Sequence, residues 1–416
     1  MLREIARGGA HVVMVCGCFP GRVVKIPQRP DPQMTHILLD FLHTVVGCRR
    51  GDDVVLDESG VQVTTQHRVV ETANPMMPAE YLTTVGVCSV PLKLAQELVS
   101  VPTTRLGDIR CILEDDLIAG WYNTGVEVSY CTVELKVKGG LPVMVGAQVP
   151  SRFELMQKLR LAEGDITELS QFDPVRWFGA CFADDVAELK QCLKQLAATP
   201  QRNLRMFLGG QPAPIGSGDP LIPGLVAEVC QTERALFICL QQYHTHAEGQ
   251  QELAPKFLQA IRQRTQAALK TSPEMYTFLT MRRLRLAACG IRASALASME
   301  ASREMQKRVH LEGARLLTLF EADGPLTPTE WEAGLLWLCR FLLGRTMMDC
   351  SIMVNLVKCS RQESDRWKEL QAQRFREFPN VKGLLYRVSI VDVDLKPIEK
   401  IPQWKTQFYR AIKYLT

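Results

Sequence analysis

Two carboxylates and two ammonium groups follow one another in the stretch SIVDVDLKPIEK, at residues 389–400. Asp392 and Asp394 alternate with valines, so both carboxylates lie on one face of an expected strand. A carboxylate that faces a cleft can hold Mg²⁺, which prefers carboxylates and phosphate oxygens as ligands. Lys396 and Lys400 are four residues apart and fall on one side if a helical turn follows. The alternative is a capped strand followed by a solvated basic turn.

A second group of charges occupies VELKVKGGLP, at residues 133–142. On a strand, Glu134, Lys136 and Lys138 point to the same face. Lysine binds phosphate as a point charge, and a neighbouring glutamate can orient the lysines. This face either binds phosphate or is a solvated surface, and the stretch alone leaves both interpretations open.

Two further stretches place polar side chains at strands. Asn203 and Arg205 share a strand face in NLRMFLGG, where they either bind phosphate oxygens or form a plain surface pair. Asp349 stands just ahead of the apolar run CSIMVNLV. It is either a cap or a carboxylate at the edge of a cleft. Phosphoryl transfer needs such a carboxylate to take or orient a hydroxyl proton.

A glycine turn lies near the start of the sequence. Gly8 and Gly9 precede an expected strand, and the next strand carries Lys25. In kinases a turn of this kind covers nucleotide phosphates, because glycine lets the backbone amides come close. For these residues alone, an ordinary turn and an edge lysine are the better interpretation.

The fragment HTHAEGQ contains His246 and Glu248 in the H-x-E spacing of zinc deaminases. No P-C-x-x-C sequence follows it, and it belongs to a glutamine-rich stretch of expected helix. We therefore expect His244 and His246 to be solvated helix residues.

The elements that position these side chains follow from hydrophobic patterns. Residues 11–16 and 22–27 predict a hairpin, and residues 127–138, 349–357 and 384–395 predict strands. Residues 225–345 are mostly typical of helix, and helices are also expected at 152–163, 184–199 and 403–414. A β-rich front, a helix-rich rear and late strands indicate an α+β fold with two lobes.

The length, composition and charge of the chain favour a globular protein with a localised basic region. The chain has 416 residues and a formal net charge of +4, too small to predict nucleic-acid binding. From Arg345 onward, 14 Lys and Arg face 8 Asp and Glu, so the surplus of positive charge lies in the tail. No apolar run is long enough for a membrane span, and the first residues do not resemble a secretory signal. The 14 scattered cysteines favour free thiols, and so a cytoplasmic or nuclear protein.

Together, these motifs resemble those of the inositol-pentakisphosphate 2-kinase family. DCSIMVNL and VSIVDVDLKPIEKIP are similar to its C-terminal signature, and VELKVKGGLP to its E-x-K-P-K-x-G-x-x-P motif. TPQRNLRMFLGG is similar to its P-Q-N-N segment, and GGAHVVMV with VVKIP to its glycine turn and basic strand. FDPVRWFGA is similar to its D-P-L-D-L-F/Y-S-G segment. The motifs follow the family order from Gly8 to Trp404.

The resemblance implies transfer of the γ-phosphate of ATP to the 2-hydroxyl of inositol 1,3,4,5,6-pentakisphosphate, with Mg²⁺ as the metal. It implies a bilobal kinase-like fold, with an N-terminal lobe at 1–116 and a C-terminal lobe at 117–416, and we expect a monomer. Asp349 would be the catalytic carboxylate and Asp392 the Mg²⁺ ligand. The implied ATP contacts are Gly8, Gly9, Ala10, His11, Lys25, Glu114, Asp115, Asp116 and Arg205. The implied contacts to the inositol phosphate are Lys136, Lys138, Arg160, Asn203, Lys396, Lys400 and Trp404.

The chain departs from the family pattern at several positions. Val137 replaces a proline, Met156 a histidine and Trp404 a tyrosine, and an arginine–proline pair has become Val101-Pro102. These departures support an alternative, in which the protein binds inositol phosphates but no longer catalyses transfer. The zinc-binding insertion of the plant members is missing, so we expect no structural zinc.

Overall fold

The protein is described from a computed structural model. It describes residues 2–7, 11–16, 22–27, 38–46, 49–56, 62–66, 76–82, 84–90, 109–115, 130–139, 141, 150–215, 222–268, 280–359, 368, 370, 374–379 and 381–414. The chain forms two compact units. The first consists of Met1–Val133, Met206–Ala213 and Met353–Val391, and the second of Glu134–Arg205, Pro214–Ile352 and Asp392–Thr416.

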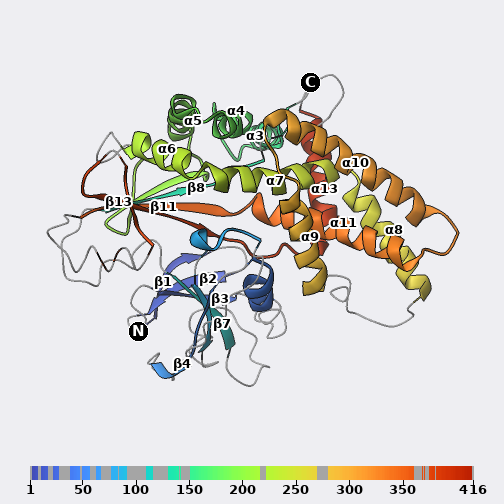
Figure 1. Cartoon of the computed structure of the whole chain (residues 1–416), viewed down its shortest axis with the longest axis horizontal. Helices are drawn as coiled ribbons and strands as arrows, with labels where there is room; N and C mark the ends of the chain where they lie inside the picture. Colours follow the sequence, from blue (N-terminus) through green and yellow to red (C-terminus); the bar gives the residue numbers. More distant parts are fainter. Residues whose placement is uncertain are drawn as a thin grey trace. The chain divides into compact units, whose positions relative to one another are not determined.

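The first unit contains a seven-stranded sheet in the order β1-β2-β3-β7-β6-β4-β5. The predicted hairpin is present, since β2 and β3 pair antiparallel with Val13 opposite Lys25, and β4 and β6 form a parallel pair. Figure 1 shows β1, β2, β3 and β7 side by side. The strands are β1 Leu2–Arg7, β2 His11–Cys16, β3 Arg22–Pro27, β4 Arg49–Leu56, β5 Gln62–Gln66, β6 Thr84–Val90 and β7 Ile109–Asp115. A π-helix η1 spans Leu42–Val46 and a 3-10 helix η2 Ala79–Tyr81.

A second sheet has the strand order β10-β9-β8-β11-β13-β12. Its strands are β8 Tyr130–Leu135, β9 Leu204–Leu208, β10 Gln211–Ala213, β11 Ser351–Lys358, β12 Arg376–Glu377 and β13 Leu384–Val391. Strand β11 is buried along all but its last residue, which agrees with its predicted apolar run. The ends of β8 and β13 and the beginnings of β9 and β11 carry the charged residues that the sequence singles out.

The second unit is mainly helical. Its helices are α3 Arg152–Ala162, α4 Pro174–Ala183, α5 Val186–Ala198, α6 Ile222–Thr232, α7 Arg234–Gln250, α8 Ala254–Ala268, α9 Met281–Ala293, α10 Met299–Glu321, α11 Pro328–Met347 and α13 Ile401–Ile412, with a 3-10 helix η5 at Ile398–Lys400. Helix α7 is central, because α4, α9, α10 and α11 all pack on it (Figure 1). Its core includes the fully buried side chains of Trp177, Phe237, Tyr243 and Trp337.

The central place of α7 corrects one sequence interpretation. His244 and His246 are not solvated: they are 0% and 4% exposed, because helices surround α7 on several sides. Burial lowers the pKa of His244 to about 4 and that of His246 to about 3, so both imidazoles are neutral at neutral pH. The glutamine-rich sequence suggested a helix exposed to solvent, but the packing of neighbouring helices buries its side chains.

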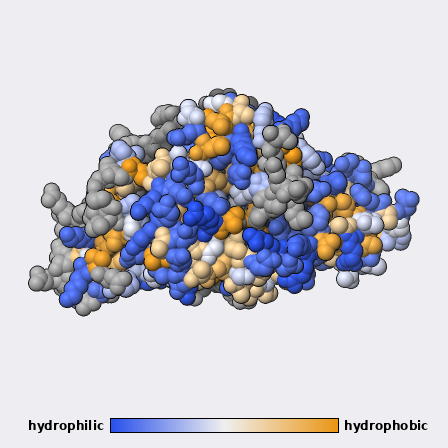
Figure 2. Space-filling model, turned by 90° about the horizontal axis from the view of Figure 1, so that it is seen from above, coloured by the Kyte–Doolittle hydropathy of each residue, from blue (hydrophilic) through white to orange (hydrophobic). Residues whose placement is uncertain are grey.

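The surface has the mixed character of folded proteins in general. On the face seen in Figure 2, hydrophilic residues dominate the described surface and hydrophobic residues gather in small groups between them. Across the described ranges, every helix is too short or too polar to cross a membrane.

The predicted α+β class is confirmed. The kinase-like arrangement of two lobes and the lobe boundary after residue 116 stay predictions. Within the helical region expected at 225–345, α9 ends at Ala293 and α10 starts at Met299 after the N-cap Ser298.

Candidate active site

Asp349 lies between the end of α11 and the start of β11, as its place before an apolar run predicted. Helix α11 begins at a capping box in which Thr327 and Glu330 satisfy each other's backbone amides. Its last residue is Met347, and the amide of Asp349 still donates to the carbonyl of Thr346 at 3.1 Å. The carboxylate is therefore attached to a well-anchored helix end, and its side chain remains 41% exposed.

Two ammonium groups bracket this carboxylate. Lys138 Nζ lies 3.4 Å from one oxygen of Asp349, and Lys396 Nζ lies 3.5 Å from the other. Burial alone would raise the pKa of Asp349, but Lys138, Lys396, Arg345 and Arg152 lower it far more, and the net pKa falls well below its usual range. Asp349 is consequently ionised at any physiological pH.

A second cluster of charges surrounds Ser351, the first residue of β11. Its hydroxyl lies 2.8 Å from an oxygen of Glu134 and 2.9 Å from an oxygen of Asp392. Lys136 Nζ reaches the same two oxygens, at 3.7 Å and 3.3 Å. Arg205 lies 3.3 Å from the other oxygen of Glu134. The buried Glu134 thus orients Lys136 and Arg205. The sequence suggested that it orients Lys136 and Lys138, but Lys138 pairs with Asp349 instead.

The placement of Asp392 differs from the sequence interpretation. Strand β13 ends at Val391, and Asp392 has a φ of 60°, in the left-handed region that aspartate tolerates better than most residues. Asp392 and Asp394 are therefore not neighbours on one strand face. The turn instead directs Asp392 to Lys136 and Ser351, while its side chain stays 48% exposed.

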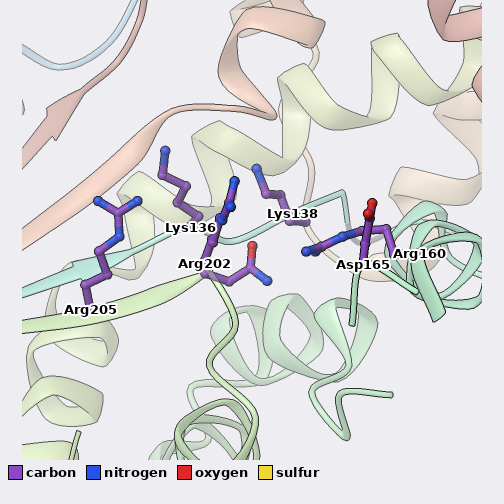
Figure 3. Close-up of a pocket in the computed structure, with 7 residues that line it drawn as sticks. Lys136, Lys138, Arg160, Asp165, Arg202 and Arg205 are labelled. Atoms are coloured by element: carbon purple, nitrogen blue, oxygen red, sulfur yellow. The ribbon is translucent and has the colours of Figure 1, made fainter. Parts of the chain in front are cut away.

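Five cationic side chains line a hollow of about 510 Å³ in the second unit. The lining residues are Lys136, Lys138, Arg160, Arg202 and Arg205, together with Asp165 and Asn203. In Figure 3, Lys136 and Lys138 extend in the same direction from the segment that follows β8. Lys138 has its pKa lowered first by burial and then by Lys136, while Asp349 opposes both. The hollow concentrates positive charge and suits a polyanion.

An adjoining hollow of about 250 Å³ shares Lys138, Arg160 and Asn203 with the first. It also reaches Asp349 and Trp404, and it adds two arginines, Arg152 and Arg345. Arg345 is 4% exposed and stacks over the Trp404 ring at 4.5 Å. Burial lowers its pKa to about 9, so the guanidinium remains charged at neutral pH. The catalytic candidate thus faces a surface lined by cationic side chains.

A strongly ionised carboxylate beside many cations can orient a hydroxyl group of a phosphorylated molecule. The comparison with known families agrees. Residues 7–407 match the family described as inositol-pentakisphosphate 2-kinase. This chain belongs to the inositol-pentakisphosphate 2-kinase family. The resemblance predicted from the motifs is confirmed, and the protein is a phosphotransferase by family. No curated protein matches the sequence.

Several residues that the family resemblance assigns to substrate lie together in this member of the family. Lys136, Lys138, Arg160 and Asn203 line the first hollow, and Trp404 lines the second. Lys396 joins them through Asp349. Lys400 does not: it is exposed at the end of η5, and it lines neither hollow. The helical turn that would put Lys396 and Lys400 on one side does not begin at Lys396, since η5 starts at Ile398. The role of Lys400 in substrate binding stays a prediction.

Sequence reasoning missed Arg152, Arg202 and Arg345. Arg345 carried a signal, since an arginine in the apolar stretch LLWLCRFLLGRTMM, four residues before Asp349, needs a partner in the interior. Arg202 follows Gln201, whose φ of 49° makes a tight turn, and no periodicity shows which way a turn residue points. Arg205, assigned to the nucleotide, lines the first hollow and pairs with Glu134.

Of the other residues assigned to ATP, some lie outside the described residues, and others are described mainly through their backbone. Gly8, Gly9, Ala10 and Asp116 are outside the described residues, as are Val101 and Pro102. The backbones of His11, Glu114 and Asp115 lie in β2 and β7, and Lys25 is half-buried in β3. All of these assignments stay predictions.

The residues present fit a divalent cation shared with a nucleotide. Among the described residues, no group of three or more His, Cys, Asp or Glu forms a site made by protein ligands alone. Magnesium in kinases instead uses one or two carboxylates together with phosphate oxygens. Asp392 offers a half-exposed carboxylate of this kind.

Proposed function

We propose that this kinase transfers the γ-phosphate of ATP to the 2-hydroxyl of inositol 1,3,4,5,6-pentakisphosphate, producing inositol hexakisphosphate. The observation that carries the proposal is the hollow of five cations that adjoins the bracketed Asp349. Membership of the family supports the same reaction.

The charge of the hollow matches the charge of that substrate. Five phosphates at about −1.5 to −2 each give roughly −7.5 to −10. The whole chain has a net charge of only +4, so a diffuse basic surface would not bind such an anion selectively. Lys136, Lys138, Arg160, Arg202 and Arg205 gather that charge in one place.

In the proposed reaction, Asp349 orients the attacking hydroxyl. A carboxylate whose pKa is so low is a weak base, but phosphoryl transfer through a loose transition state needs little proton removal beforehand. Substrate phosphates would also compete for Lys138 and Lys396. As the phosphates draw these ammonium groups away, the pKa of Asp349 rises and its oxygens become free to accept the hydroxyl hydrogen.

Asp392 would hold the Mg²⁺ that accompanies ATP, and Lys136 and Ser351 would orient its carboxylate. When bound, the metal offsets the charge of the triphosphate. The ATP contacts assigned from the family, the kinase-like bilobal fold and a monomeric state belong to the same proposal. The cysteine pattern supports a reducing compartment, the cytoplasm or the nucleus.

The direct test is turnover. Purified full-length protein is incubated with Mg·ATP and inositol 1,3,4,5,6-pentakisphosphate, and inositol hexakisphosphate is quantified. Formation of the hexakisphosphate supports the proposal. Tight binding of the pentakisphosphate without product would identify the alternative, a family member that only binds inositol phosphates. If the protein neither binds nor phosphorylates the pentakisphosphate, both the kinase proposal and the binding-only alternative are wrong.

A further inference from the structure

Helix α7 presents two buried ionisable side chains one turn apart, and each touches the backbone beside a residue of the proposed active site. His244 and Glu248 are 0% and 7% exposed. Neither lines the hollows described above. Their positions, four residues apart, place them on the same side of the helix.

Glu248 holds the segment that carries the two lysines. One carboxyl oxygen accepts the backbone N–H of Leu141 at 3.1 Å. The other lies against Gly139, so closely that a Cβ on that glycine would be 2.1 Å from it. Gly139 directly follows Lys138, and Leu141 comes two residues after Gly139. The carboxyl group therefore fixes the backbone from which Lys136 and Lys138 extend.

His244 holds the segment that carries Asp349. Its Nε2 lies 3.3 Å from the carbonyl oxygen of Met347, and since a carbonyl only accepts, Nε2 carries the hydrogen. The ring packs edge-to-face on Phe178, with centroids 5.5 Å apart. Met347 is the last residue of α11, two residues before Asp349. The imidazole therefore fixes the backbone from which the carboxylate extends.

Packing alone does not explain these residue types. Burying a carboxyl group or an imidazole costs free energy that an apolar side chain would not cost. Within the described structure, Glu248 Oε1 and His244 Nδ1 even lack a hydrogen-bond partner. Burial raises the pKa of Glu248 to about 8, although Arg152 and Arg345 oppose the rise. The hydrogen bonds that Glu248 and His244 make to the backbone of Leu141 and Met347 offset this free-energy cost.

We propose that His244 and Glu248 are positioning residues, through which α7 sets the separation of Lys138 and Asp349. The inference rests on the proposed function, because it assigns Glu248 to the substrate-binding lysines and His244 to the catalytic carboxylate. The two residues should therefore have different kinetic roles although they are one turn apart.

The test compares three substitutions in α7. Glu248→Met keeps the length and removes the acceptor for Leu141, and His244→Phe keeps the ring and removes the N–H donor. His246→Phe is the matched control, because His246 is equally buried but contacts Ser294 instead. Steady-state kinetics are measured with the pentakisphosphate and with ATP, and thermal unfolding is recorded for each variant.

We expect Glu248→Met to raise KM and Kd for the pentakisphosphate by about tenfold or more, and to leave kcat nearly unchanged. His244→Phe should lower kcat by about tenfold or more and leave that Kd unchanged, since a displacement of about 1 Å can cost up to 10²-fold in rate. Glu248→Gln should restore most of the affinity, because its amide oxygen still accepts from Leu141. If both variants behave like His246→Phe, the inference is wrong.

A second measurement does not depend on catalysis. Hydrogen exchange should increase in a peptide covering residues 136–141 for Glu248→Met, and in a peptide covering residues 346–350 for His244→Phe. If the wild-type protein makes no hexakisphosphate but these shifts occur, the proposed function fails and the positioning role of α7 stands. Unchanged exchange in both peptides would overturn the positioning role.

Discussion

Asp349 and its two lysines form a unit in which each group sets the state of the others. Lys138 and Lys396 keep the carboxylate ionised, and the carboxylate opposes the lowering of the Lys138 pKa by burial. The same lysines are proposed to bind substrate phosphates, so the arrival of substrate changes the basicity of the catalytic candidate.

The substitution Asp349→Asn keeps the shape of the side chain and removes its charge. We expect kcat to fall by about 10²–10⁴-fold, the usual span for loss of a general base. Binding of the pentakisphosphate, measured by calorimetry, should persist or tighten, because Lys138 and Lys396 lose a competing anion. Near wild-type turnover would show that Asp349 is not the catalytic carboxylate.

Gly139 is a position where an added methyl group has no room. A Cβ there would lie 2.1 Å from Glu248 and 2.5 Å from Met348. Gly139→Ala should therefore lower the free energy of unfolding by about 1–3 kcal/mol, as overpacking usually does. Gly324→Ala is the control, since nothing lies within 4 Å of a Cβ there, and it should change stability by less than about 0.5 kcal/mol. Urea unfolding of both variants distinguishes the two sites.

At the scale of elements, the sequence predicted those strands and side-chain positions that follow from the local pattern of apolar residues. The hairpin β2–β3 and the strand β11 follow from alternating or continuous apolar runs, and Asp349 lies where its run predicted. The burial of His244 and the turn at Asp392 depend on neighbours that are distant in sequence. Three arginines of the hollows, Arg152, Arg202 and Arg345, were missed for the same reason, because only tertiary packing determines which way they face.

Helix α3 carries Arg152 and Arg160. It packs against α13, the last helix of the second unit. Leu155, Leu159, Phe408 and Ala411 form the shared apolar cluster. Phe408→Ala should cost about 3–5 kcal/mol of unfolding free energy. The pentakisphosphate should also bind more weakly, because α3 loses its support. Tyr409→Ala, at a neighbouring side chain that is 44% exposed, should have a small effect on both. If Phe408→Ala and Tyr409→Ala lower the free energy of unfolding equally in chemical denaturation, Phe408 does not have this packing role.

At the scale of the whole molecule, the charge that matters is local. Affinity for the pentakisphosphate should fall steeply between low and high salt, because several half-exposed cations attract one polyanion. Arg202→Met should reduce both the affinity and its salt dependence. Lys307→Met, on the exposed face of α10, is the control and should leave both unchanged. A titration at two salt concentrations shows whether the hollow is the binding site.

Stability should also depend on pH through the buried groups of α7. The pKa values of His244 and His246 are lowered to about 4 and about 3 from 6.5, so unfolding becomes easier as pH falls below about 6.5. The pKa of Glu248 is raised from 4.5 to about 8, so its contribution is lost as pH rises to about 8. Between 4.5 and 6.5 the two histidines outweigh the glutamate. The melting temperature should therefore peak near pH 6.5, and Glu248→Gln should remove the decline from 6.5 to 8.

The order of strands in the second sheet has a consequence for biosynthesis. Strand β8 lies between β9 and β11, and 217 residues separate Glu134 at the end of β8 from Ser351 at the start of β11. At about 5–20 residues per second, a ribosome needs roughly 10–40 s to make that distance. Throughout that time the nascent chain has β8 but lacks the strand that covers its other edge, and β9 is made only partway through the interval. Unpaired edges recruit other strands, so the growing chain passes through a period when it is open to aggregation.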